Sequence, residues 1–120
     1  MRVGLGDTWQ KTTIIVATEF GRTAAANGTG GTDHGTGSAA LILGGDVNGG
    51  RVIADWPGLS QSNLYENRDL KPTTNLDTLI ASLASASFGL DNTLVAKTLF
   101  PESANNKFLG NKLLDGLIKT

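Results

Sequence analysis

Two short apolar segments, separated by a long glycine-rich loop, constrain this chain more than any other feature of its sequence. Thr12–Thr18 is β-branched and almost entirely apolar, and Ser38–Leu43 is a second apolar run that ends at Gly44 and Gly45. Runs of this kind are typical of strands buried on both faces, as in a parallel sheet covered by helices. The pattern predicts an α/β fold in which both strands belong to a mainly parallel sheet flanked by helices.

Two helices are predicted in the second half of the chain. Thr74 is a candidate N-cap, and apolar residues at helical spacing follow it as far as Phe88. Gly89 is a typical residue at a helix C-terminus. A second, shorter helix is predicted to start after Asp91 and to stop before Pro101, because proline cannot continue a helix.

The other connections give weaker signals. Asn48-Gly49 predicts a two-residue hairpin turn, and residues 105–120 are compatible with a last helix or with a docked tail. Two or three strands and two helices are too few elements to cover both faces of a parallel sheet. We therefore expect residues 1–120 to be a single C-terminal fragment of a larger α/β domain.

Composition excludes several classes of function. The chain has 120 residues, with 10 basic and 11 acidic side chains, so it offers no basic surface for nucleic acid. Cysteine is absent, which removes disulfides, thiolate ligands and thiol nucleophiles. The sequence contains no apolar run near the length of roughly eighteen residues that a transmembrane helix needs.

The loop between the two predicted strands is the candidate site. It carries the only histidine, His34, directly after Asp33, while Glu19 and Arg22 lie where the first strand ends. Ten of the sixteen glycines fall between positions 21 and 50, and glycine lets a backbone approach a ligand closely. In open α/β sheets ligands bind at the carboxyl ends of strands, so these four side chains are predicted to share a site.

Each of these side chains has a functional and a purely structural interpretation. Imidazole and carboxylate groups are common ligands of divalent metals, so Asp33 and His34, with Glu19 as a third ligand, form a candidate site for zinc, manganese or calcium. Alternatively, His34 only hydrogen-bonds within the loop and Asp33 caps a turn. Arg22 is a candidate catalytic residue that holds an anionic group bidentately; the alternative is a salt bridge from Arg22 to Glu19 or Asp33.

Two other chemistries are disfavoured by the motifs. The glycines are not followed by the Gly-Lys-Ser/Thr of a phosphate-binding loop, and Gly35-Thr-Gly37-Ser-Ala-Ala40 precedes a strand rather than following one. Nucleotide binding is therefore not expected. The chain also lacks the Gly-x-Ser-x-Gly turn of many serine hydrolases.

Taken together, several of these motifs resemble the C-terminal part of the DUF1501 family, a group of uncharacterised bacterial proteins. The matching segments are ATEFGRT, GTDHG, LILGGDVNGGRVIADWPGL and DLKPTTNLDTLIASLASASFGL, within about Thr12 to Pro101. That family is related to sulfatases and to the alkaline phosphatase superfamily. The resemblance implies a mainly parallel sheet between helices, with the nucleophile and the first aspartate ligand in an N-terminal half.

The superfamily resemblance also implies roles for single residues. Glu19-Phe20-Gly21 occupies the place of a metal-binding Asp-His-Gly, so Glu19 stands in for the aspartate, whereas Phe20 cannot replace the histidine ligand. His34 resembles a later metal-binding histidine that precedes a strand and a glycine-rich turn. In this scheme Glu19, Asp33 and His34 bind metal and Arg22 holds the anionic oxygens.

Three functional hypotheses follow. The first is a metal-dependent hydrolase of phosphate or sulfate esters in the parent protein, with an anionic small molecule or glycan as substrate and this chain inactive alone. The second is a non-catalytic module that binds an anion, a glycan or a partner. The third is an inactive remnant of a truncated gene. The resemblance implies a periplasmic or secreted parent, and the sequence gives no oligomeric state.

Overall fold

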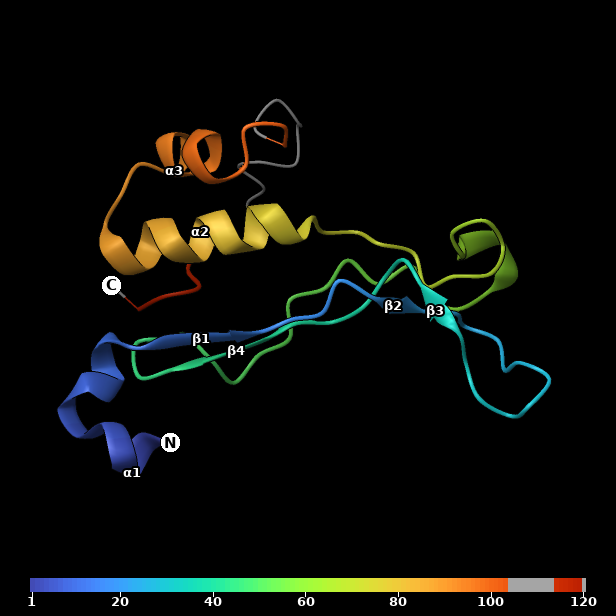
Figure 1. Cartoon of the computed structure of the whole chain (residues 1–120), viewed down its shortest axis with the longest axis horizontal. Coiled ribbons are helices and arrows are strands. Elements are labelled where there is room, and N and C mark those ends of the chain that lie inside the picture. The colour runs from blue at the N-terminus through green and yellow to red at the C-terminus, as the bar shows by residue number, and fades with distance from the viewer. Residues whose placement is uncertain (104–113, 120) are drawn as a thin grey trace. The chain divides into compact units, whose positions relative to one another are not determined.

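The computed structural model describes residues 1–103 and 114–119, which fall into two compact units (Figure 1). Unit 1 consists of Met1–Ile15, Ile42–Ile53 and the described part of Thr74–Thr120. Unit 2 consists of Val16–Leu41 and Ala54–Thr73. Each unit therefore combines segments that are distant in the sequence.

A two-stranded sheet forms where the two predicted strands meet. After the short helices α1 (Arg2–Leu5) and η1 (Gly6–Lys11), strand β1 (Thr13–Val16) pairs with strand β4 (Leu41–Gly44). A Cβ atom on Gly44, the last residue of β4, would collide with the carbonyl oxygen of Thr12, just before β1. The end of β4 thus lies beside the start of β1, so the two strands run antiparallel.

The prediction of a mainly parallel sheet flanked by helices is wrong. The described residues contain two sheets of two strands each, β1–β4 and the antiparallel pair β2–β3. Parallel neighbours need a crossover, usually a helix, but the chain between β1 and β4 has no helical period and folds into the β2–β3 hairpin. Burial on both faces is also wrong, since Leu41 and Leu43 of β4 are 63% and 41% exposed.

Helices α2 (Leu76–Phe88) and α3 (Asn92–Leu99) supply the core of unit 1. Buried side chains on α2 face two neighbours: α3, and the segment at the C-terminus together with β1 and β4. The first cluster joins Ala81, Val95 and Ala96, with Ala84 and Phe100 against it. The second joins Leu83, Leu114 and Leu117, with Ile15, Ile42, Leu79 and Ile118 against it. One face of the β1–β4 sheet is therefore covered.

Both predicted helices are confirmed, because their signals are local. Asp91 caps α3, its carboxylate accepting a hydrogen bond from the Leu94 N–H at 2.8 Å. Gly89 ends α2 in the left-handed conformation, at φ 63°, where glycine is favoured. The N-cap of α2 is Asn75 rather than Thr74, and its side chain accepts a hydrogen bond from the Asp77 N–H at 2.7 Å.

This cap gives a direct test of the helix boundary. Replacing Asn75 with alanine should lower the free energy of unfolding by about 1 kcal/mol, because the Asp77 N–H loses its acceptor. Replacing Thr74 with alanine should change it much less. Urea denaturation of both variants, followed by circular dichroism, measures the difference. Equal losses in both variants would contradict the observed cap.

The C-terminal segment docks onto the chain after β4, which settles an alternative that the sequence left open for residues 114–119. Val47 forms an isolated antiparallel bridge with Ile118, and the Asn48 N–H donates to the Leu117 carbonyl at 2.8 Å. The hairpin predicted at Asn48-Gly49 is wrong, because residues 51–58 form no strand and the Asn48 N–H pairs with this C-terminal segment. Residues 105–113 and 120 of the predicted helix or tail lie outside the described residues.

Candidate functional site

The site predicted from the sequence lies in unit 2, on a short hairpin. Strands β2 (Gly21–Arg22) and β3 (His34–Gly35) pair antiparallel, with Gly21 opposite Gly35 and Arg22 opposite His34. Directly opposed residues of an antiparallel pair project from the same face, with their Cβ atoms about 5 Å apart. Arg22 and His34 are therefore neighbours on one face, and both side chains are exposed.

A third segment, residues 68–70, is bound to this hairpin through backbone hydrogen bonds. The N–H of Leu70 donates to the carbonyl of Arg22, and the N–H of Gly37 donates to the carbonyl of Leu70, each at 3.1 Å. The N–H of Arg22 donates to the carbonyl of Gly37, also at 3.1 Å. The backbone that carries Arg22 is thus fixed from both sides, while its side chain stays exposed.

Glycines are required here for close packing of backbone on backbone. A Cβ atom on Gly21 would collide with the Thr36–Gly37 peptide, and one on Gly37 would collide with the carbonyl of Leu70. A Cβ atom on Gly35 would lie 2.6 Å from the carbonyl carbon of Arg22. The sequence predicted that glycines let the backbone approach a ligand; at these three positions the close neighbour is the chain itself.

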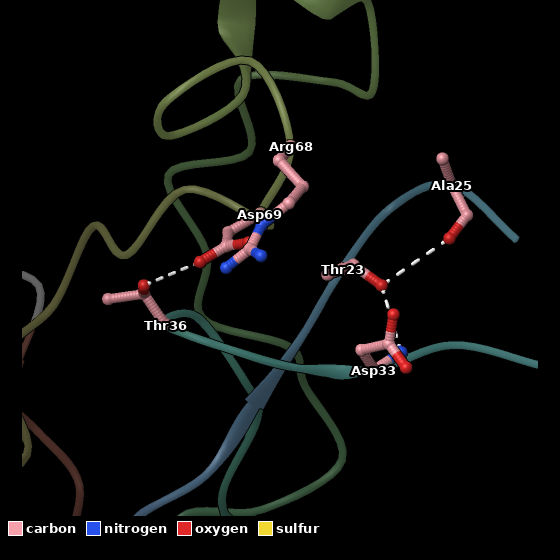
Figure 2. A network of polar contacts seen from close by, with 6 residues as sticks. All are labelled: Thr23, Ala25, Asp33, Thr36, Arg68 and Asp69. Carbon is pink, nitrogen blue, oxygen red and sulfur yellow. Dashed lines mark hydrogen bonds and ion pairs between the residues drawn. The ribbon is translucent and has the colours of Figure 1, made fainter. Parts of the chain in front are cut away.

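A buried carboxylate joins the hairpin to the third segment (Figure 2). Asp69 is only 3% exposed, and its two carboxylate oxygens accept hydrogen bonds from Thr36 Oγ1 at 2.9 Å and from Arg68 Nε at 2.7 Å. The hydrogen bond from Arg68, followed by that from Thr36, holds the pKa of Asp69 below its ordinary value. The same bond raises the pKa of Arg68, so the pair stays ionised at neutral pH.

Asn27 organises the loop between β2 and β3. Its side-chain oxygen accepts hydrogen bonds from the N–H groups of Thr29 and Gly31, each at 3.0 Å. Its amide nitrogen donates to the carboxylate of Asp33 at 2.9 Å. Thr23 Oγ1 accepts from the Asp33 N–H at 3.1 Å (Figure 2). The loop is therefore held by its own side chains, and Asp33 contributes to this through its bonds with Asn27 and Thr23.

The four predicted site residues are placed differently. Arg22 and His34 are adjacent, and the His34 ring stacks on Phe20 with ring centroids 4.6 Å apart. Arg22 Nη1 donates to the Thr32 carbonyl at 3.3 Å. Within the described residues the ion pair found joins Arg68 to Asp69, so the alternative of a salt bridge from Arg22 to Glu19 or Asp33 is not formed. Glu19 is exposed just before β2.

The predicted metal ligands do not fit a self-sufficient metal site. In the part of the chain that the structure describes, no three His, Asp or Glu side chains are grouped closely enough to hold an ion. Asp33 already accepts a hydrogen bond from Asn27, and His34 stacks on Phe20. Zinc, manganese or calcium bound by Glu19, Asp33 and His34 stays a prediction, as does the catalytic role of Arg22.

A shallow cavity of about 270 Å³ also lies in unit 2. Its lining is neutral and largely aliphatic, which suits an anionic ligand less well than the exposed Arg22–His34 pair does. The lining residues are Ala24, Ala25, Leu59, Gln61, Leu64 and Asn67. The cavity begins after β2 and continues over the 3₁₀ helix η2 (Gln61–Asn63).

Sequence reasoning missed Asp69 and its hydrogen bond with Thr36. The stretch Leu59–Lys71 has no clear period, and nothing in it marks Asp69 as buried. The local signal that exists is weak: Glu66 and Asn67 adopt left-handed conformations, at φ 52° and 58°, in a tight turn, and asparagine tolerates that conformation better than most residues. Such a turn predicts a hairpin, which matches the bridge between Tyr65 and Asp69.

The described residues thus form a small mixed α/β protein with an exposed Arg–His pair on a glycine-packed hairpin. Over residues 3–99 the chain matches the model of the family described as "Protein of unknown function (DUF1501)", and it belongs to that family. The resemblance drawn from the sequence motifs is confirmed at this level. No curated protein and no solved structure matches the chain. Among the described residues, no helix has both the length and the apolarity that crossing a membrane requires.

Proposed function

We propose that this chain is part of a protein that hydrolyses phosphate or sulfate esters, and that Arg22 and His34 bind the anionic oxygens of the ester. The observation that carries the proposal is the pairing of Arg22 with His34 across β2 and β3. A guanidinium offers a planar fork of N–H donors that matches a phosphate or sulfate group. An imidazole beside it adds one further N–H donor.

The hairpin supports this role by holding the two side chains in place. The hydrogen bonds of Arg22 with Gly37 and Leu70 fix the backbone below the guanidinium. Preorganised donors bind an anion more strongly, because less conformational entropy is lost on binding. Among the described residues no three candidate ligands are grouped closely enough to hold an ion, and metal binding by Glu19, Asp33 and His34 stays a prediction, so no step of the proposal runs through a metal ion.

A non-catalytic anion- or glycan-binding module is the second candidate, and the lowered pKa of Asp69 favours it. A hydrolase needs a nucleophile and a base, and the hydroxyl of Thr36, which donates to the carboxylate of Asp69, is arranged as such a pair would be. However, the pKa of Asp69 lies below its ordinary value. A general base works best when its pKa is near the working pH, so Asp69 is poorly suited to activate Thr36.

Anion binding is testable on the isolated chain, because His34 is its only histidine. Sulfate and then phosphate are titrated at constant ionic strength, and binding is followed by the NMR chemical shifts of the His34 imidazole. We expect saturable shifts in the wild type. Arg22→Ala should weaken binding about tenfold, because a charged bidentate contact is lost.

The matched control is Arg51→Ala. Arg51 belongs to unit 1, where its guanidinium donates to the carbonyls of Asn48 and Gly116. This variant should bind sulfate as the wild type does. Equal weakening in both variants, or shifts that never saturate, would exclude a specific site at Arg22 and His34. Turnover of a nitrophenyl phosphate or sulfate then separates the hydrolase from the binding module.

A further inference from the structure

We infer that Phe20 is a positioning residue that orients the His34 imidazole for anion binding; this inference rests on the proposed function. The two rings are stacked, with centroids 4.6 Å apart and an angle of 16° between their planes. This is the close end of the range in which aromatic rings attract one another. The contact therefore fixes the plane of the only imidazole in the chain.

The hairpin brings the two rings within reach of one another. Arg22 is opposite His34 in the paired strands, so their side chains share one face of the hairpin. Phe20 precedes β2 and lies outside the paired stretch, two residues before Arg22. Its ring nevertheless stacks on the His34 ring, so the stack lies next to the Arg22–His34 pair.

Burial does not account for this placement. Phe20 is 51% exposed, so a large part of its ring remains in contact with water. A phenylalanine that served the core would be covered by other apolar side chains, as Leu83 and Leu117 are in unit 1. The stack with His34 is the aromatic contact of Phe20, and it lies beside Arg22.

Stacking has a specific consequence for the imidazole. Both ring nitrogens lie at the edge of the ring, and a stacked face leaves that edge accessible. Because the ring plane is held by Phe20, an N–H of His34 is directed along a fixed plane on the face that also carries Arg22. An oxyanion can then accept hydrogen bonds from both side chains without first ordering the imidazole.

The test compares three variants at position 20. Phe20→Tyr keeps an aromatic ring, Phe20→Leu keeps apolar bulk without a ring, and Phe20→Ala removes both. Two quantities are measured on each full chain: the ring-current displacement of the His34 carbon-bound protons, and the dissociation constant for sulfate. Phe88→Ala serves as control, since Phe88 is 76% exposed in unit 1.

We expect Phe20→Leu and Phe20→Ala to lose the ring-current displacement and to bind sulfate about three- to tenfold more weakly. Phe20→Tyr and Phe88→Ala should match the wild type in both quantities. Wild-type affinity in Phe20→Leu, despite a lost displacement, would overturn the inference and leave the proposed function standing. Absence of saturable sulfate binding in the wild type, with the displacement present, would overturn the proposed function and this inference together.

Discussion

Replacing Gly37 with alanine is expected to break the attachment of the third segment to the hairpin. Gly37 is buried, and a Cβ atom there would collide with the carbonyl oxygen of Leu70 and lie 3.0 Å from its carbonyl carbon. The obstacle is backbone, which cannot rotate away as a flexible side chain can. The same two residues share a hydrogen bond, so the two segments must separate for the methyl group to fit.

Overpacking of this kind costs about 1–3 kcal/mol, and more where the surroundings cannot relax. Amide hydrogen exchange measures this loss of stability at individual residues, because it reports the free energy of opening each hydrogen bond. The amides of Arg22, Gly37 and Leu70 should exchange roughly ten- to hundredfold faster in Gly37→Ala than in the wild type. The side chains of Arg22 and His34 would then lose their fixed spacing, so sulfate affinity should fall with the protection.

Gly28→Ala is the matched control within the same loop. A Cβ atom on Gly28 meets no other atom within 4 Å, and Gly28 does not need a left-handed conformation. Alanine there should leave the exchange rates unchanged or slow them slightly, because the unfolded chain loses freedom. Similar exchange in Gly37→Ala and Gly28→Ala would contradict the close backbone packing described above.

Local signals in the sequence predicted the helices well. The spacing of apolar residues from Leu76 to Phe88 and the glycine at position 89 act within a few residues of each other, so they are readable without the fold. The strands were located for the same reason. The relative direction of the two strands and the burial of their faces were not predictable in this way, because both depend on the path of the chain between Val16 and Leu41.

The proximity of two candidate residues was predicted, while their roles stay predictions. Arg22 was selected at the end of the first predicted strand and His34 as the only histidine of the glycine-rich loop, and the structure places them opposite one another. Asp69 was missed because its hydrogen-bond partner Thr36 lies 33 residues earlier in the chain. Glycine was recognised as permitting close approach, but sequence alone does not say whether the approaching group is a ligand or a carbonyl such as that of Leu70.

Asp69→Asn is expected to have the second large effect, and its size depends on pH. Both carboxylate oxygens of Asp69 accept hydrogen bonds, from Thr36 and from Arg68. An asparagine side chain is uncharged, so the charge-assisted hydrogen bond from Arg68 is weakened, and the NH₂ group can pair with Thr36 only if the hydroxyl turns to accept. At neutral pH the amides of Gly37 and Leu70 should therefore exchange at least tenfold faster in the variant.

The pH dependence follows from the lowered pKa of Asp69 in the folded state. Its stabilising effect is fully present above the unfolded value, which for aspartate is about 3.9, and is lost as the pH falls through the lower folded value. In the wild type, protection of the Gly37 and Leu70 amides should decline below about pH 4. In Asp69→Asn this decline should be absent, because no proton is taken up at that position.

The control for this experiment is Asp55→Asn, which removes an exposed carboxylate of the same unit. It should retain both the neutral-pH protection and the acid decline of the wild type. An acid decline that persists in Asp69→Asn would assign it to another carboxylate. Sulfate affinity measured on the same samples should follow the protection of Leu70, because the bond from its N–H to the Arg22 carbonyl fixes the backbone below the guanidinium. Asp69 would then govern anion binding without touching the anion.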